Sequence, residues 1–284
     1  MRKVSDEGSS SPFIARIFMG ILEFRDQLYL LSAQAEDRKR QQDRFDQAFK
    51  PVLEASQAAR DAAVAGLKLL TDHISRIENG DAVRFRGNQY DILEGIDAEL
   101  SQEVDKLIDQ SMVAIKSGLQ DMLRDLLDLD IGFLFQNDQQ FAGGIADLSA
   151  AGENELADYL EVIRGTWLDS LQDLRNRHEH RGWSLNSLAY ELVAQNEVQV
   201  RLPTVDGILL DQFIRQTTNR VLLFVENMLV FAMARRVQYP IFVKEIPPDR
   251  RNPVDPKRFV LAPKGLDNSP RWRITFEDGV DFVK

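Results

Sequence analysis

The sequence predicts a mainly α protein, a helical bundle with long antiparallel helices and a small C-terminal appendage that is partly β. Up to residue 237, apolar residues recur every three or four positions in several long segments, which is the spacing of a buried helix face. Most of the prolines, together with several β-favouring runs, come after that point. With 284 residues, of which 44% are hydrophobic and 28% charged, the chain is long and apolar enough to bury a sizeable core.

The first part of the chain is predicted to be a helical hairpin. Apolar residues follow Phe13 at helical steps, which predicts a first helix there. A highly charged stretch comes next, and Pro51 suits the first turn of a second helix that pairs with the first, because a helix start leaves its N–H groups unbonded. Residues 79–92 have turn residues at both ends of a short alternating run, which predicts a small β-hairpin.

The central part is predicted to hold the most buried helices. An apolar stripe at helical spacing covers residues 93–129, and the glycine pair within residues 131–144 predicts a loop or a broken helix after it. The next stripe covers residues 156–174. Residues 208–237 become apolar nearly all round, so we expect this helix at the centre of the bundle.

Between the last two helices the sequence changes character. Gly182 is expected to stop the preceding helix, Ser184 to cap a shorter one, and residues 197–205 to be extended. The chain is therefore predicted to have four parts: a disordered N-terminus (1–12), a helical hairpin arm (13–92), a helical bundle (93–238) and a basic, proline-rich, partly β tail (239–284).

Composition excludes several classes of protein and site. The chain has no cysteine, so it has no disulfides, thiolate nucleophiles or cysteine-bound metals, as is typical of a reducing compartment. The apolar segment near the N-terminus carries several charges, so neither a signal peptide nor a membrane span is predicted, and we expect a cytoplasmic protein without a membrane partner. A net charge of −10 discourages nonspecific binding to nucleic acid.

The densest chemical signal is the run RNRHEH at residues 175–180, where a predicted amphipathic helix ends. Two of the three histidines in the chain, His178 and His180, stand there close to Arg175. Histidine can take and give a proton near neutral pH, and an arginine fork matches phosphate oxygens. Such a set suits phosphoryl transfer without a metal when a ribose 2′-hydroxyl is the nucleophile. We therefore expect neither a metal nor a cofactor.

These residues resemble the motif of the HEPN superfamily, which is an arginine, then a polar residue that is often asparagine, then a gap and a histidine. The match here is Arg175-Asn176-x-x-x-His180. The resemblance covers the motif closely and the surrounding helical bundle loosely, over residues 90–237. It implies a metal-independent endoribonuclease in which His180 is the general base and acid, Arg175 holds the scissile phosphate, and Asn176 orients one of them.

The resemblance also implies partners and a biological role. The family usually places two motifs face to face across a dimer, so one motif per chain implies a homodimer with a composite active site, or a related partner. RNA is the implied substrate, and the implied role is that of a bacterial toxin or phage-defence effector with an antitoxin or other regulatory partner. A subset of the family is shut off through a tyrosine two places after the histidine; Gly182 stands there, so this regulation is not predicted.

Helix geometry limits how the motif can work. Residues five apart on a continuous helix lie about 140° apart around its axis, so Arg175 and His180 can share a site only if the helix loosens or ends between them. In that case we expect both to face one exposed, positively charged cleft. His178 is the substitute histidine and Glu179 its orienting carboxylate, since both lie on the Arg175 side of a continuous helix; Arg177 is a further candidate.

Other interpretations of the chain remain open. A solvated helix end also explains the run, with an ion pair between Arg175 and Glu179 and histidines that favour the helix C-terminus. The alternative to a nuclease is a noncatalytic HEPN-like helical module for dimerisation or partner binding, and a third hypothesis is a structural helical protein that assembles through residues 33–78. Asn227 and His73 are expected to be structural groups.

The C-terminal tail mixes aromatic and basic residues. Residues 244–273 contain eight Lys or Arg against four Asp or Glu. Single-stranded nucleic acid can use such a mixture, whereas an ordinary β tail with solvated basic residues is the other interpretation. The residues predicted to contact RNA are Arg181 at the helix end and, in the tail, Arg250, Arg251, Lys257 and Arg258.

Overall fold

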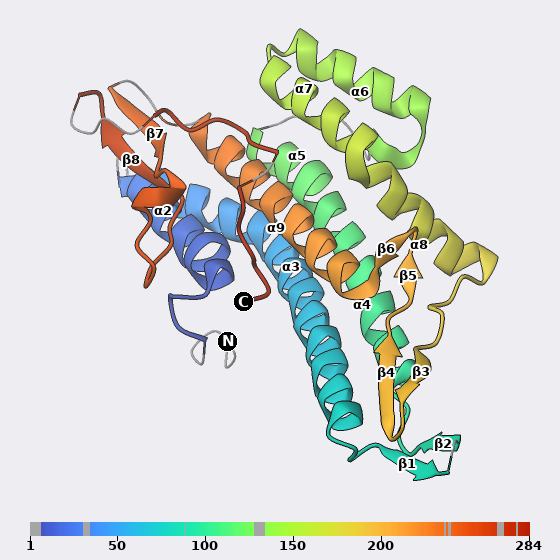
Figure 1. Cartoon of the computed structure of the whole chain (residues 1–284). Helices are drawn as coiled ribbons and strands as arrows, with labels where there is room; N and C mark the ends of the chain where they lie inside the picture. The colour runs from blue at the N-terminus through green and yellow to red at the C-terminus, as the bar shows by residue number, and fades with distance from the viewer. Residues whose placement is uncertain are drawn as a thin grey trace.

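The structure is a computed structural model that describes residues 7–30, 35–87, 89–127, 134–235, 237, 240–265, 270–276 and 278–284. The fold is mainly α with small antiparallel sheets, as predicted (Figure 1). The α-helices are α2 (Ile21–Leu30), α3 (Ala35–Glu78), α4 (Asp97–Lys116), α5 (Met122–Leu127), α6 (Asp138–Ala150), α7 (Asn154–Ile163), α8 (Asp169–Arg181) and α9 (Leu210–Ala234). Short π-helical or 3-10 segments are η1 (Phe13–Gly20), η2 (Ser117–Asp121), η3 (Leu134–Gln136), η4 (Arg164–Leu168) and η5 (Pro248–Arg250).

Strands pair only with their neighbours along the chain. Each of the four sheets in the described part of the chain is a two-stranded antiparallel hairpin. The strands are β1 (Val83–Arg86), β2 (Gln89–Ile92), β3 (Ala189–Ala194), β4 (Glu197–Arg201), β5 (Thr204–Val205), β6 (Ile208–Leu209), β7 (Ile241–Glu245) and β8 (Phe259–Pro263). The hairpin predicted over residues 79–92 and the extended segment predicted over 197–205 are both confirmed.

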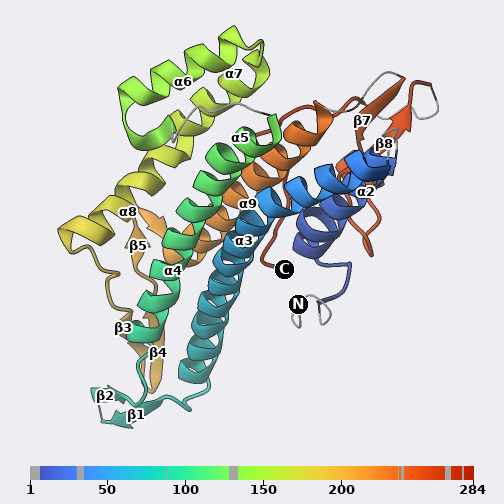
Figure 2. The same cartoon turned by 180° about the vertical axis from the view of Figure 1, so that it is seen from behind.

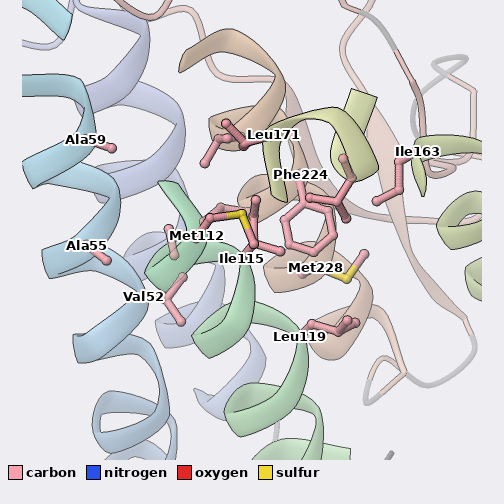
Figure 3. Close-up of a cluster of buried hydrophobic side chains, with 14 of the residues drawn as sticks. Val52, Ala55, Ala59, Met112, Ile115, Leu119, Ile163, Leu171, Phe224 and Met228 are labelled. Carbon is pink, nitrogen blue, oxygen red and sulfur yellow. The ribbon is translucent and has the colours of Figure 1, made fainter. Parts of the chain in front are cut away.

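The main core lies where α3, α4 and α9 pack side by side (Figure 1). Figure 3 shows that the contact surface of α3 is made of small side chains such as Ala55 and Ala59, which let the neighbouring helices approach closely. Larger side chains of the other helices fill the space between them, including Met112, Ile115, Phe224 and Met228.

The helix α9 is at the centre of the molecule, as its sequence predicts. Every residue from Val221 to Met233 is buried, including the polar pair Glu226 and Asn227. A helix that is apolar on all sides needs neighbours on all sides, and here these are α3, α4, α5 and the C-terminal tail. None of the helices that the structure describes is long and apolar enough to cross a lipid bilayer.

One long helix replaces the two segments that Pro51 was predicted to separate. The helix α3 runs through Pro51 without ending. A proline in a helix interior costs about 3 kcal/mol relative to alanine, because it removes a hydrogen bond. Phe49 and Val52 are buried on either side of it, and burial of two large apolar side chains offsets that cost. The start near Phe13 is confirmed, although its first turns are the π-helical η1.

Two further expectations came from turn residues. The loop or broken helix predicted over 131–144 is a broken helix in its described residues: η3 ends before Asn137, which caps α6 by accepting a hydrogen bond from the Gln140 N–H at 2.9 Å, and Phe141 of α6 is buried. Residues 131–133 lie outside the described residues. The shorter helix predicted after Ser184 is absent from the described residues 182–188, which are irregular and lead into β3.

The tail after α9 returns to the N-terminal end of the chain. Figure 2 shows α2 beside the hairpin of β7 and β8. The C-terminal residues then cross α9, where Asn227 donates a hydrogen bond to the Thr275 carbonyl at 2.7 Å and Phe282 is fully buried against η1. The partly β character predicted for the tail is confirmed in its described residues.

Candidate functional site

The predicted motif lies on the last two turns of α8, which we call the α8 end (residues 175–181). The helix is continuous through Arg181 and stops at Gly182, which takes the left-handed conformation with φ 67° and donates its N–H to the Arg177 carbonyl. Glycine suits this position because it lacks a Cβ. The predicted stop at Gly182 is therefore confirmed. The helix ends after His180, however, and not between Arg175 and His180, where a break was needed for both side chains to face one site.

Arg175 faces α4 and is paired with carboxylates. Its Nη2 lies 2.5 Å from Glu179 Oε1, one turn later on the same helix, and its Nε lies 3.7 Å from Asp109 of α4. The side chain is 34% exposed. Glu179 therefore pairs with Arg175, while His178, the histidine it was predicted to orient, meets Asp105.

His178 lies on the same side of α8 and also meets α4. Its Nε2 is 3.3 Å from Asp105 Oδ1, and its ring contacts the edge of Trp183 with centroids 6.3 Å apart. Burial raises the pKa of the Asp105 carboxyl and Asp109 adds to this, while His178 opposes it. His178 Nδ1 is buried, and its Nε2 is directed at Asp105. His178 is thus placed as a packing residue between two helices.

His180 is the exposed histidine of the α8 end. Its side chain is 71% exposed, and its Nε2 lies 3.6 Å from Glu179 Oε2. Asn176, one turn earlier, lies on the same side of the helix and is half-buried. Glu179 therefore lies between Arg175 and His180, with one carboxylate oxygen toward each, and the two motif side chains do not contact each other directly in the described structure.

Arg177 is held by Asp206, which lies in the tight turn between β5 and β6. Its Nη2 donates to both carboxylate oxygens of Asp206, at 2.9 and 2.7 Å, and its Nε lies 2.9 Å from Asp173. Asp206 and Gly207 form the two-residue loop between β5 and β6, and both have positive φ, as a type I′ hairpin requires. The Asp206 hydrogen bond and its charge raise the pKa of Arg177 despite partial burial. Arg181 is exposed, 3.9 Å from Asp173.

The α8 end is consequently not a positively charged cleft. Its three arginines lie within reach of four carboxylates, Asp109, Asp173, Glu179 and Asp206, and His178 meets a fifth, Asp105. The carboxylates on α4 were missed by the sequence analysis. The sequence shows that Asp105 and Asp109 are four residues apart on a polar helix face, but it does not show that α4 packs against α8.

Two of the tail arginines predicted to contact RNA are buried in ion pairs, so that prediction is corrected for them. Arg258 is 0% exposed and its Nη1 lies 2.7 Å from Glu226 of α9. Arg251 forms two hydrogen bonds of 2.8 Å with Asp278. Lys257 is half-buried and pairs with Glu23 and Asp255, and Arg250 is exposed.

These pairs belong to a buried ionic cluster that joins distant parts of the chain. Arg16 of η1 makes a two-point contact with Glu226, at 2.8 and 2.5 Å, and also pairs with Asp278 at 2.5 Å. We use the name buried ionic cluster for Arg16, Glu226, Glu245, Arg251, Arg258 and Asp278.

The arginines lower the pKa of two carboxyls in the buried ionic cluster. Burial alone would raise the pKa of Glu226, but Arg16 and Arg258 outweigh it, and the pKa is lowered. Burial likewise opposes ionisation of Asp278, whose pKa is lowered by Arg251 and Arg16. These ion pairs fix the N-terminal and C-terminal segments on α9.

The remaining polar residues singled out in the sequence are structural, as expected. Asn227 is buried and bonds Tyr159, Thr275 and Arg258. His73 is buried and its Nε2 lies 2.9 Å from the Tyr190 hydroxyl, which links α3 to β3. Within the described residues, no group of three or more His, Asp or Glu side chains is placed to hold a metal ion.

Comparison of the chain with protein-family models, with curated proteins and with solved structures gave no match. The motif and the geometry described above are therefore the basis of the functional proposal.

Proposed function

We propose that the chain is a HEPN-type endoribonuclease that cleaves RNA without a metal, by attack of the ribose 2′-hydroxyl, and that acts as a dimer. The observation that supports this proposal is the position of the Arg175-Asn176-x-x-x-His180 motif on the last, solvent-facing turns of α8, with His180 the most exposed histidine of the described chain. An exposed imidazole can reach a substrate proton.

The proposed site uses a second copy of the chain. Glu179 lies between Arg175 and His180 of one chain, so in the proposal His180 of one copy acts with Arg175 of the other copy across a twofold axis. A phosphate would replace Glu179 as the partner of Arg175. Exposed ion pairs contribute only about 0–1 kcal/mol, so this exchange costs little.

Each residue of the motif then has a role. His180 takes the proton of the 2′-hydroxyl and returns one to the leaving oxygen. Arg175 binds two oxygens of the scissile phosphate and stabilises the charge that develops there. Asn176, on the same side of α8 as His180, orients the histidine.

The proposal includes further features that the structure does not test. A bundle of long antiparallel helices and a cytoplasmic location are supported by the sequence patterns alone. A homodimer with composite sites and a role as a toxin or phage-defence effector, controlled by an antitoxin or another regulatory partner, are supported by the family resemblance alone.

A second candidate function is a noncatalytic HEPN-like module for dimerisation or partner binding. The charge balance of the α8 end favours it. Asp109 and Glu179 already neutralise Arg175, and Asp206 neutralises Arg177, so a phosphate must compete with carboxylates for each guanidinium. A surface with matched charges is suited to a protein partner with its own pattern of charges.

RNA cleavage in EDTA tests the first proposal. We expect the wild type to produce cyclic phosphate ends, and Arg175→Ala and His180→Ala each to abolish cleavage. Arg84→Ala, an exposed arginine of β1, is the matched control and should cleave normally. Cleavage that survives both motif substitutions excludes this site, and a dimeric wild type that leaves RNA intact supports the noncatalytic module.

Mixed dimers test the composite site directly. In a dimer of Arg175→Ala with His180→Ala, one site has lost both residues and the other retains both. Random mixing should therefore restore about a quarter of the wild-type activity from two inactive proteins, as twofold symmetry dictates. Restoration of none would show that each site is built within one chain.

A further inference from the structure

A cavity of about 720 Å³ lies between the start of α7, the end of α9 and strand β7. Its volume is within the range of about 300–1,000 Å³ that is typical of small-molecule sites. It shares no lining residue with the α8 end. The C-terminal segment passes over it from β7 toward α7 (Figure 1).

One wall of the cavity is basic. Residues 270–274 follow the free edge of β7, where the Trp272 N–H donates to the Val243 carbonyl and the Glu245 N–H to the Pro270 carbonyl, both at 2.9 Å. Antiparallel pairing puts alternate side chains on the same side, so Arg271 and Arg273 project together. Neither forms an ion pair with a residue that the structure describes. Two guanidiniums on the same side of the segment suit a phosphate group.

Apolar and aromatic residues also line the cavity. Phe231, Val243 and Trp272 are buried, with the Val243 and Trp272 side chains on the other side of the pairing from Arg271 and Arg273. The Phe242 ring also lines the cavity and holds the Arg271 guanidinium 5.5 Å from its centroid. Aromatic side chains beside cations are suited to a flat ring that carries a negative group.

A second part of the lining, on α7, carries acidic side chains, and Arg235 of the α9 end lines the cavity as well. Glu155 and Asp158 lie on the first turns of α7, and Glu155 also accepts a hydrogen bond from the Ile274 N–H at 3.2 Å. The third acid, Glu153, is buried and paired with Arg235. An ionised carboxylate only accepts hydrogen bonds, so this part of the lining calls for a ligand with donors. Amino-bearing bases provide them: guanine, adenine and cytosine have an exocyclic NH2, whereas uracil has an acceptor there.

We propose that this cavity binds a nucleoside monophosphate with an amino-bearing base. The phosphate lies on Arg271 and Arg273, the base against the aromatic part of the lining, and its amino group at Asp158. The ligand is a free nucleotide or the end of an RNA strand, which share this chemistry. The inference does not depend on the ribonuclease proposal, because the two sites have no residue in common.

Calorimetric titration of the full chain tests this site with GMP, UMP, guanosine and inorganic phosphate as ligands. We expect GMP to bind at least about tenfold more tightly than each of the others, which corresponds to about 1.4 kcal/mol. The double variant R271A/R273A should weaken GMP by at least about tenfold, as two charge-assisted contacts predict. Asp158→Asn should remove the preference for GMP over UMP.

Two matched controls accompany these variants. Arg250→Ala removes an exposed arginine outside the cavity, and His180→Ala removes the proposed catalytic base; neither should change GMP binding. A short single-stranded RNA that binds more tightly than GMP, and loses this in R271A/R273A, identifies the strand end as the source, whereas equal or weaker binding identifies the free nucleotide. Absence of GMP binding in the wild type, equal binding of phosphate and GMP, or an unchanged R271A/R273A variant would overturn the proposal.

Discussion

The α8 end and the buried ionic cluster are both built from arginines and carboxylates, but water reaches only the first. Side chains at the α8 end are between one quarter and three quarters exposed, whereas Arg16, Glu226 and Arg258 are at most 1% exposed. In the cluster, each charge depends on its partners, because a buried unpaired charge is costly. At the α8 end, water can replace any partner, so the pairs are exchangeable. The same pairing chemistry therefore holds segments together in one region and leaves groups available to a ligand in the other.

The largest expected effect is that of removing the central charge of the cluster. Glu226→Gln leaves Arg16 and Arg258 buried with less than their full compensation and should reduce the free energy of unfolding by about 3–5 kcal/mol. Urea unfolding followed by circular dichroism measures this. The matched control is Glu179→Gln at the α8 end, where an exposed pair should contribute less than about 1 kcal/mol. Equal losses in the two variants would contradict the comparison.

The second largest effect is expected at acid pH, which should reduce the free energy of unfolding that the buried ionic cluster contributes. The pKa of Asp278 is lower in the folded protein than its ordinary value of about 3.8–3.9, since Arg251 and Arg16 outweigh burial. The folded state therefore binds this proton less readily than the unfolded state, and the stability from Asp278 is complete above about pH 4 and is lost as pH falls through the folded pKa. Between pH 5 and pH 3 the wild type should lose more stability than Asp278→Asn does. An identical loss in both would show that Asp278 contributes nothing to acid unfolding.

A smaller effect is expected for the best-formed pair of the α8 end. A double-mutant cycle with Arg177→Ala and Asp206→Asn should give a coupling of about 0.5–1 kcal/mol, because the two-point contact is partly exposed. In 1 M NaCl the coupling should fall, since the Debye length shrinks to about 3 Å. If the coupling free energy does not change with salt concentration, Arg177 is shielded from solvent to the same degree as the members of the buried ionic cluster.

The two regions also differ in how far the sequence predicts them. Helical periodicity predicts α4 and α9 well, because a buried face repeats at every turn. It also predicts the divergence of Arg175 and His180 on a continuous helix. The cluster is a different case: Arg16 and Glu226 are 210 positions apart, and each is a single charge within an apolar stretch.

Local rules failed where tertiary contacts outweighed them. Pro51 and the Gly143–Gly144 pair lie inside helices, because buried neighbours such as Phe49 and Phe141 stabilise the helical conformation there. For the same reason the acidic partners on α4 could not be assigned to the α8 end from spacing alone. The packing of whole helices decides which polar faces come into contact, and this packing cannot be read directly from a single sequence.

The smallest effect should have the opposite sign. Burial raises the pKa of Asp105, and Asp109 adds to this, so its ionised form destabilises the folded protein although it lies near His178. Asp105→Asn should therefore leave stability at pH 7 unchanged or raise it by up to about 1 kcal/mol. Because the folded state binds this proton more readily than the unfolded state, the gain should shrink as pH falls below the folded pKa.

Urea unfolding at pH 7 and pH 4 measures this small effect, with Asp109→Asn as the control one turn later on α4. That variant removes a partner of Arg175 and should gain nothing. A clear loss of stability in Asp105→Asn at pH 7 would make the Asp105–His178 contact a structural pair of the kind found in the cluster. In that case the contacts between α4 and the α8 end would contribute to stability as the Arg16–Glu226 pair does. Replacement of Glu179 by a phosphate at Arg175 would then cost more than an exposed ion pair implies.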